Sequence, residues 1–271
     1  MDIHKKDKLT EILKQLESVV IGFSGGVDST LLVKVCLDTL GMENVWAVTG
    51  NSDSVMPEEF ENCKSLANCL GLDSEHFLTI ATNEIDDPNY IANSLDRCYF
   101  CKHELFNKLT DIAKKVGAKS MLDGTNASDL GDYRPGMKAG KELKVRAPLA
   151  EAGFTKDDIR ELAKDLALPN WDKPSMPCLA SRIPYNSQVT VEKLKQIADA
   201  ERYLRELGFK QFRVRHHGKI ARLELDNMDI LLKNGMKQQI NDRLKEIGFA
   251  YVTVDLGGFK SGSLNIDLKG R

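Results

Sequence analysis

The sequence predicts an α/β protein whose first part is a parallel sheet and whose second part is a smaller α+β domain. Strand-like segments alternate with helical segments up to about residue 175. Such alternation is typical of βαβ units, which build parallel sheets. The pattern breaks in the stretch WDKPSMPCLASRIPYNSQ, which contains three prolines and is expected to be a loop. We therefore expect one domain over residues 1–175 and a smaller α+β domain over residues 185–271.

The expected elements of the first domain are bounded by residues that begin or end helices. Pro57 lies near the start of one helix, Gly41 and Gly71 end two others, and Thr155 caps a fourth. The expected strands are residues 18–24, 44–51, 75–82 and the beginning of 119–129, and the expected helices are residues 29–41, 56–72, 101–118 and 155–168.

The second domain is expected to contain two helices, a hairpin and a further strand. The hairpin turns at His217 and Gly218, between two runs of alternating polar and apolar residues. The helices are expected over residues 190–209 and 227–249, the hairpin over 211–225 and the last strand over 251–258. Two helix–Gly–Phe–strand runs suggest a weak internal repeat.

Composition favours a water-soluble protein with a substantial core. The 271 residues are 42% hydrophobic and 29% charged, and the net charge is -2. This charge gives no general attraction to nucleic acid or to an anionic membrane. No apolar run approaches the roughly 20 residues that cross a bilayer. We expect a cytoplasmic protein without a membrane or nucleic-acid partner.

The stretch VVIGFSGGVDSTLLVKVCLDTLG joins an apolar strand to a helix through a turn rich in glycines and hydroxyls. A glycine-rich turn that leads into a helix directs backbone N–H groups and the positive helix end at one point, which suits a phosphate. A Walker A loop would carry a lysine where Asp28 stands, and a Rossmann fingerprint would need three spaced glycines. A carboxylate beside phosphates is explained if it helps to hold a magnesium ion.

The run Ser-Gly-Gly-Val-Asp-Ser resembles the PP-loop of the N-type ATP pyrophosphatases, whose fold is also called adenine nucleotide alpha hydrolase-like. The resemblance implies cleavage of ATP between its α and β phosphates, with pyrophosphate held in the loop. Asn51 and Ser52, at the end of the second strand, would then lie near adenine and ribose. By resemblance, the residues that bind pyrophosphate and its magnesium ion are Ser24, Gly25, Gly26, Asp28, Ser29 and Thr30.

Four further stretches narrow the family: LDGTNASDLGDYRPGMKA, VRAPLAEAGFTKDDIRELAKDLAL, PCLASRIPYN and VTVDLGGFKSG. With the loop they resemble the ATP-dependent sulfur transferases that build the nickel-pincer nucleotide of lactate racemase. The resemblance implies that a carboxylate of pyridinium-3,5-biscarboxylic acid mononucleotide is adenylated and then converted to a thiocarboxylate. Some members of this family take the sulfur from their own cysteine, at the position that matches Cys178.

Three cysteines suggest a second source for the sulfur of the thiocarboxylate. Cys98 and Cys101 form a Cys-x-x-Cys pair, and Cys178 follows a proline. Three thiolates can hold a 4Fe–4S cluster with one iron left open, and part of the family resembles this pattern. The sulfur would then come from inorganic sulfide or another outside donor. A zinc site that also uses His103, a redox pair and uncoordinated thiols remain alternatives.

Other polar residues are candidates for substrate and nucleotide contacts, with turn formation or solvation as the alternative. Arg182 is expected to hold a phosphate or carboxylate and, with Cys178 and Asp28, to be catalytic. Arg97 is expected to donate to phosphate or to solubilise its loop. The remaining candidates are Asp123, Gly124, Asn126, Asp129, Tyr133 and Arg134 on the loop after a strand, and Arg213 and Arg215 on one face of the hairpin.

Two other functions remain open from the sequence. A tRNA thiolase shares the PP-loop and a cysteine trio, but it would need a basic RNA surface. A nucleotide-binding scaffold would have kept the loop without catalysis. The leading interpretation is the sulfur transferase, with ATP, magnesium and a 4Fe–4S cluster as cofactors, a small nucleotide as substrate, and a homo-oligomeric state.

Overall fold

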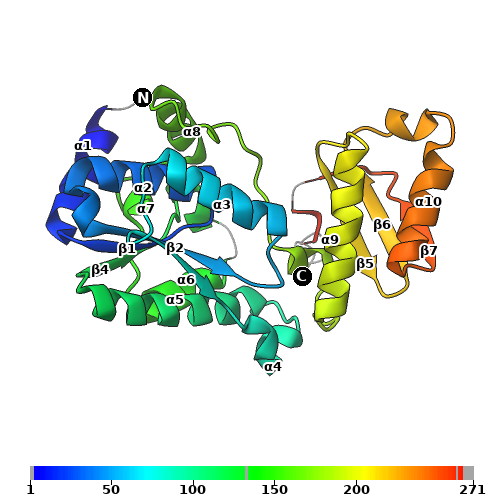
Figure 1. Ribbon diagram of the computed structural model, residues 1–271, viewed down its shortest axis with the longest axis horizontal. Helices are drawn as coiled ribbons and strands as arrows, with labels where there is room; N and C mark the ends of the chain where they lie inside the picture. Colours follow the sequence, from blue (N-terminus) through cyan, green and yellow to red (C-terminus); the bar gives the residue numbers. More distant parts are fainter. Residues whose placement is uncertain (1–2, 132–133, 261, 265–271) are drawn as a thin grey trace. The chain divides into compact units, whose positions relative to one another are not determined.

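The computed structural model describes residues 3–131, 134–260 and 262–264 (Figure 1). The chain forms two compact units. The first contains the chain up to Tyr90 and Leu95–Met176, and the second contains Ile91–Ser94 and the chain from Pro177 onward. The predicted domain ranges, 1–175 and 185–271, differ from these units in the short segment Ile91–Ser94 and in the placement of residues 177–184.

The first unit contains the expected parallel sheet, with four strands in the order β3-β2-β1-β4. In the register of the sheet, Val19 of β1 lies opposite Val45 of β2 and Ser120 of β4. All carboxyl ends of the strands therefore lie at one edge, where open α/β sheets bind ligands. The strands are β1 Val19–Gly22, β2 Val45–Asn51, β3 Phe77–Ala81 and β4 Ser120–Leu122.

Helices cover both faces of this sheet. Successive residues of a strand point to opposite faces, and β1 carries apolar side chains on both of them. Val19 and Ile21 of β1 pack into one core, and Val20 packs into the other. Figure 1 shows α2 and α3 on one side of the sheet and α5 and α6 on the other. The helices are α1 Ile3–Leu16, α2 Val27–Leu40, α3 Pro57–Cys69, α4 Pro88–Ile91, α5 Arg97–Val116, α6 Gly136–Glu142, α7 Pro148–Glu151 and α8 Lys156–Asp165, with 3₁₀ turns at Met42–Asn44, Glu84–Asp86 and Ala127–Gly131.

Two helices of the first unit begin earlier than predicted. Helix α2 starts at Val27 and β1 ends at Gly22, so the loop between them lies two residues earlier than the sequence suggested. Helix α5 starts at Arg97 instead of Cys101, which places both Cys98 and Cys101 within its first turns. Helix α8 begins after Thr155, whose side chain caps it as expected.

The second unit is an α+β structure, as predicted. Its three-stranded sheet has the order β5-β6-β7, in which β5 and β6 form the expected antiparallel hairpin and β7 runs parallel to β6. Apolar residues of α9, α10 and these strands share one core. The elements are α9 Val191–Glu206, β5 Phe212–His217, β6 Ile220–Leu225, α10 Met236–Ile247 and β7 Tyr251–Val254, with 3₁₀ turns at Leu179–Arg182 and Asp229–Leu232.

We predict that the cap of α8 contributes measurably to stability. The Thr155 hydroxyl accepts from the Asp158 N–H (3.3 Å), and the Asp158 carboxylate accepts from the Thr155 N–H (2.8 Å). Thr155→Ala should lower the free energy of unfolding by about 1 kcal/mol, whereas Thr155→Ser should retain most of it. Urea unfolding followed by circular dichroism measures both, and an alanine variant as stable as the serine variant would contradict the role of the hydroxyl.

We also predict that the second unit loses stability on mild acidification. Burial, followed by the charge of Lys193, lowers the pKa of His216 below its ordinary value of 6.5. Burial, followed by the charges of Arg222 and Arg215, lowers the pKa of His217 in the same way. The unfolded chain therefore binds protons at a higher pH than the folded chain, so the stabilisation is complete above about pH 6.5 and is lost as the pH falls through the lowered folded-state values.

The measurement is the free energy of unfolding between about pH 7.5 and pH 5.5. In the wild type the His216 Nε2 lies 2.9 Å from Gln196 Oε1. Glutamine at position 216 keeps a donor for this contact but does not titrate. Replacing both histidines by glutamine should flatten the pH dependence, and a double variant as acid-sensitive as the wild type would show that other groups cause it.

Candidate functional site

The phosphate-loop candidate lies at the carboxyl end of β1, between the central strand and α2. Gly25 has φ +66°, and a Cβ added there would lie 2.7 Å from the Cys63 Sγ, so only glycine fits. No described side chain caps α2 at Gly26, which is extended. The first N–H groups of α2 therefore remain available for an anion at the positive end of the helix.

Ser24 and Ser29 hold the loop together. The Ser29 hydroxyl accepts from the Ser24 N–H (3.2 Å), lies 3.1 Å from the Ser24 Oγ and donates to the Gly26 carbonyl (3.1 Å). Ser29 is buried, whereas Ser24 is exposed. The Ser24 hydroxyl is thus the one that faces solvent, and the Ser29 side chain shapes the turn.

The expectation that the Thr30 side chain meets pyrophosphate does not agree with its position. Thr30 is 0% exposed, and its hydroxyl accepts a hydrogen bond from the Asn170 side chain (2.9 Å). Thr30 lies on the first turn of α2 with its side chain directed into the protein. Its contribution is to the support of the loop.

Asp28 forms an ion pair that the sequence did not reveal. The Lys156 Nζ lies 2.7 Å and 2.6 Å from the two carboxylate oxygens of Asp28. Lys156 is the first residue of α8, and its N–H donates to the Ser128 hydroxyl (3.1 Å). Asp28 remains half-buried at the edge of the loop, with carboxylate oxygens of the kind that magnesium prefers.

The loop after β2 lies at the same edge of the sheet as the phosphate-loop candidate, because β2 is next to β1 and parallel to it. Asn51 is exposed at the end of β2, and the Ser52 hydroxyl accepts from the Ser54 N–H (3.2 Å). The Ser54 hydroxyl in turn donates to Glu84 (2.8 Å) and lies 2.7 Å from the Tyr90 hydroxyl. Asn51 and Ser52 therefore lie on a braced loop beside the phosphate-loop candidate.

The loop after β4 approaches α2 closely. A Cβ added to Gly124 would lie 3.0 Å from the Ser29 nitrogen. Asn126 and Asp129 form turn contacts, since the Asn126 side chain accepts from the Ser128 N–H (2.9 Å) and Asp129 accepts from the Asn126 N–H (3.1 Å).

Both of these side chains are buried, so they shape this loop rather than project from it. The exposed Arg134 lies 2.7 Å from Asp129. Asp123 accepts from the Thr125 N–H and lies 3.7 Å from Lys102, a lysine of α5 that no sequence pattern marked. Tyr133 is outside the described residues.

The six cysteines divide by environment. Burial raises the pKa of Cys63 to about 11 and that of Cys36 further, so both remain thiols in the core, as the helical pattern of apolar residues around them predicts. The helical pattern of apolar residues around Cys69 predicts a buried side chain as well, but Cys69 is exposed. Cys98 is exposed and Cys101 is half-buried, and both lie at the positive end of α5.

No three His, Cys, Asp or Glu side chains are grouped to hold a metal ion in the part of the chain that the structure describes. The His103 Nδ1 lies 3.1 Å from the Asn107 Nδ2, and its ring packs on Tyr99. Arg97 is buried, which argues against a solubilising role.

In the second unit, Arg182 supports the backbone around Cys178 instead of facing a substrate. Arg182 is 0% exposed, and its Nε and Nη2 each lie 2.9 Å from an oxygen of Glu201. Its Nη1 donates to the carbonyls of Pro177 (2.6 Å) and Cys178 (3.1 Å). The expected direct contact with a phosphate or carboxylate is therefore not supported, because the donors are occupied within the protein.

Arg213 and Arg215 lie on the same face of β5, as predicted. The Arg215 guanidinium forms a bidentate pair with Glu224 (3.0 and 2.9 Å) and is buried. The Arg213 guanidinium lies 5.0 Å from the Phe259 ring centre.

Burial, and next the charge of Arg182, lowers the pKa of Arg213 to about 10. The charge of Arg215 acts in the same direction, whereas the carboxylates of Glu201 and Glu224 oppose it. The described part of the second unit thus brings Arg182, Arg213 and Arg215 close to these two carboxylates, and Arg222 also lies 3.3 Å from Glu224.

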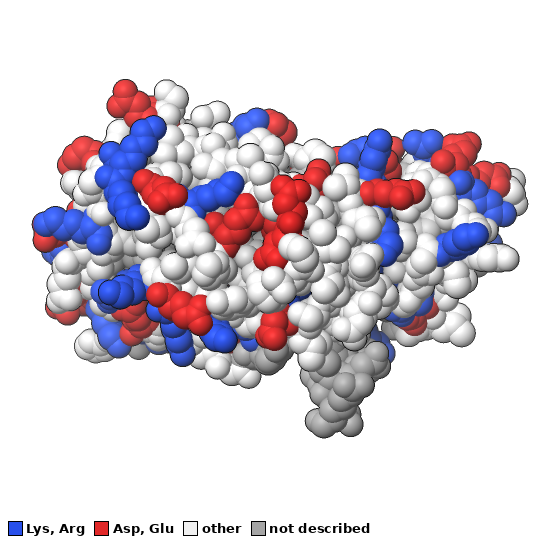
Figure 2. All heavy atoms as spheres, turned by 90° about the horizontal axis from the view of Figure 1, so that it is seen from below, with Lys and Arg blue, Asp and Glu red and all other residues white. Residues whose placement is uncertain are grey.

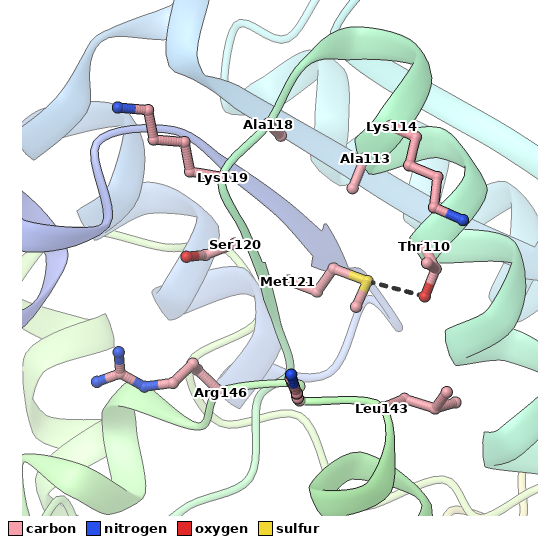
Figure 3. Close-up of a pocket in the computed structure, with 10 residues that line it drawn as sticks. Thr110, Ala113, Lys114, Ala118, Lys119, Ser120, Met121, Leu143 and Arg146 are labelled. Atoms are coloured by element: carbon pink, nitrogen blue, oxygen red, sulfur yellow. Dashed lines mark hydrogen bonds between the residues drawn. The ribbon is translucent and has the colours of Figure 1, made fainter.

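A groove of about 450 Å³ lies beside β4, and none of its lining residues belongs to the phosphate-loop candidate (Figure 3). Met121 and Leu143 contribute apolar side chains, and Lys119 and Arg146 lie at its rim. Lys119 pairs with Glu17, and Arg146 pairs with Glu151. The groove is therefore separate from the phosphate-loop candidate, and these two cations are already neutralised.

Comparisons with known proteins give one family match and several full-length relatives. The family model described as NAD synthase matches residues 5–91. An uncharacterised protein of Synechocystis is 43% identical over 263 residues, covering 96% of this chain and 97% of the relative.

Pyridinium-3,5-bisthiocarboxylic acid mononucleotide synthase of Lactiplantibacillus plantarum is 42% identical over 264 residues, covering 96% of this chain and 94% of the relative. A more distant relative, argininosuccinate synthase of Pyrococcus furiosus, is 28% identical over 169 residues, covering 57% of this chain and 40% of the relative.

We predict that Asp28→Asn removes about a hundredfold or more of the rate of pyrophosphate release from ATP while the fold stays intact, because the charge beside the phosphates is lost. Asp38→Asn is the matched control, since Asp38 lies on the same helix and also pairs with a lysine, Lys34 (2.6 Å). Pyrophosphate release is measured by a coupled assay, and folding by circular dichroism. An Asp28 variant as fast as the Asp38 variant would exclude this role.

Proposed function

The chain belongs to the PP-loop family of pyridinium-3,5-bisthiocarboxylic acid mononucleotide synthases, and from this premise we propose that it is an ATP-dependent sulfur transferase acting on the corresponding biscarboxylic acid mononucleotide. The observation that carries the proposal is the 42% identity to such a synthase over 96% of the chain. The Ser24–Ser29 loop at the end of β1 supplies the matching phosphate site.

The proposed reaction has two steps. A substrate carboxylate oxygen attacks the α-phosphorus of ATP, a P–O bond forms, and pyrophosphate leaves with the electrons of the broken bond. A sulfide sulfur then attacks the activated acyl carbon, AMP leaves, and a thiocarboxylate remains. Adenylation is required because an oxygen of a free carboxylate is a poor leaving group, whereas AMP leaves readily.

The loop residues have distinct proposed roles in the first step. The N–H groups of Gly25 and Gly26, the start of α2 and the exposed Ser24 hydroxyl would bind pyrophosphate. Asp28 would hold the magnesium ion, with Lys156 as the neighbouring cation. Ser29 and Thr30 would support the loop from within.

Other residues would bind the two nucleotides. Asn51 and Ser52 would contact the adenosine of ATP, since their loop follows the strand next to β1. Gly124 would allow the loop after β4 to approach α2 closely. The turn contacts of Asn126 and Asp129 would hold this loop in place, so that the exposed Arg134 could contact a nucleotide. Arg213, together with Arg215 on the same face of β5, would bind the phosphate of the substrate mononucleotide.

For the second step, we propose that Cys98, Cys101 and Cys178 hold a 4Fe–4S cluster. The donor chemistry fits, because two of these thiols lie one turn apart at a helix start and none of the three is fully buried. When bound, such a cluster would supply sulfide sulfur that originates outside the protein. The alternative is that Cys178 itself donates the sulfur and is consumed.

We further propose a cytoplasmic homo-oligomer. The cysteine chemistry requires thiols, which a reducing cytoplasm preserves. Among the described helices, none has the length and apolar character needed to cross a bilayer.

A tRNA thiolase remains the second candidate, but it has less support. Figure 2 shows basic and acidic side chains interspersed over one face of the described atoms, without a continuous basic surface there. A mobility-shift assay with tRNA tests this candidate, and tight tRNA binding would favour it over the small-nucleotide substrate.

The sulfur source can be tested with single cysteine variants of anaerobically purified protein. If the cluster is correct, alanine at position 98, 101 or 178 should lower iron content and sulfur transfer together and should leave carboxylate-dependent ATP–pyrophosphate exchange intact. Cys69→Ala is the control, because Cys69 is an exposed cysteine outside the trio. This variant should keep the iron content and the sulfur transfer of the wild type.

The sacrificial alternative makes a different prediction for the same proteins. Variants at positions 98 and 101 would then support one turnover without iron, and mass spectrometry would show that Cys178 had lost hydrogen sulfide. That mass loss in an active, iron-free protein would rule out the cluster.

A further inference from the structure

Asn170 is a buried side chain that connects the phosphate loop to the segment after α8. It is 6% exposed, and its amide Nδ2 donates to the Gly25 carbonyl (3.1 Å) and to the Thr30 hydroxyl (2.9 Å). These partners are 145 and 140 residues away in the sequence. The sequence pattern around Asn170 gave no sign of either contact.

The orientation of the amide follows from the chemistry of its partners. A backbone carbonyl can only accept a hydrogen bond, so the nitrogen and not the oxygen of Asn170 must face Gly25. The Asn170 Oδ1 is buried and has no hydrogen-bond partner among the described residues. Burial of an unsatisfied oxygen is unfavourable, which indicates that the position is retained for what the Nδ2 contacts.

The contact with Gly25 determines where a neighbouring N–H points. The Gly25 carbonyl and the Gly26 N–H belong to one planar peptide, and in a trans peptide they point in opposite directions. Asn170 draws the carbonyl inward, so the Gly26 N–H is directed outward, where it donates a long hydrogen bond to the exposed Ser24 Oγ (3.4 Å). This is the side on which the first N–H groups of α2 are available.

Without this contact the peptide between the two glycines would be held only by the long hydrogen bond from the Gly26 N–H to the Ser24 Oγ (3.4 Å) among the described contacts of its two polar groups. Gly25 has no Cβ and lies at φ +66°, a region that glycine enters and leaves without steric cost. A rotated peptide would turn a carbonyl oxygen towards the anion and repel it. A fixed peptide presents the N–H before the anion arrives, and such preorganisation improves affinity.

Asn170 is itself held firmly enough to act in this way. The Lys173 N–H donates to the Asn170 carbonyl (3.1 Å), and the Lys173 side chain pairs with Glu59 of α3 (2.6 Å). The neighbouring Trp171 packs under the Lys164 ammonium, 5.0 Å from the ring centre. The side chain therefore projects from a segment that is fixed on both sides.

We propose that Asn170 is a positioning residue that locks the Gly25–Gly26 peptide and so preorganises the loop for pyrophosphate. The inference rests on the proposed pyrophosphate site. It assigns a function to a residue outside the loop, and it implies that the donor group rather than the bulk of the side chain is needed.

The test is calorimetric binding of magnesium pyrophosphate to the full-length protein, with Asn170→Asp as the main variant. Aspartate keeps the shape but cannot donate to the Gly25 carbonyl, so the dissociation constant should rise about tenfold or more. Asn170→Ala should weaken binding about tenfold, whereas Thr30→Val, which removes only the second contact, should weaken it about twofold or less. In ATP–pyrophosphate exchange the KM for pyrophosphate should rise more than kcat falls.

Asn44→Ala is the matched control, because the Asn44 side chain donates to the Leu40 carbonyl (2.8 Å) at the opposite end of α2. It should lower the melting temperature without changing pyrophosphate affinity. Wild-type affinity in both Asn170 variants, or an equal loss in Thr30→Val and Asn170→Ala, would overturn the role of the Gly25 contact. A wild-type protein that binds no pyrophosphate would overturn the proposed function itself, and the inference with it.

Discussion

The central constraint of this structure is that the loop after β1 must turn its carbonyl oxygens inward. Three of them are bonded within the protein: Phe23 accepts from the Thr49 hydroxyl (2.8 Å), Gly25 from Asn170 (3.1 Å) and Gly26 from the Ser29 hydroxyl (3.1 Å). With the carbonyls satisfied on the inner side, the N–H groups and the start of α2 form a surface of positive potential. The sheet, α3 and the segment after α8 all contribute to this arrangement.

The charges around the loop follow from the same requirement. A carboxylate at Asp28 would by itself repel a phosphate a few ångströms away. Lys156 lies on both oxygens of that carboxylate, so the rim of the loop carries a paired charge instead of a negative one. The lysine is brought there by α8, whose first turn is fixed by the Thr155 cap. A local helix signal therefore determines the electrostatics of a site 128 residues away.

The features that could be predicted from the sequence are those that depend on neighbouring residues. The strands, the glycine turn, the Thr155 cap and the hairpin at Gly218 each follow from a few adjacent side chains, and the structure contains them. Lys156, Asn170 and Glu201 act through partners far away in the chain, so no local pattern marked them. For the same reason, Arg182 was interpreted as a substrate contact although its partner is a carboxylate on α9.

The Arg182–Glu201 pair has a consequence for Cys178 that does not depend on the sulfur source. A fully buried ion pair adds little net stability, because desolvation offsets the attraction, but loss of one partner is costly. Glu201 also accepts from the Val214 N–H (3.1 Å), so the carbonyl of Cys178 is tied through Arg182 to both α9 and the edge of β5. A cysteine that binds a cluster and one that gives up its own sulfur both need a fixed backbone, and this network provides it.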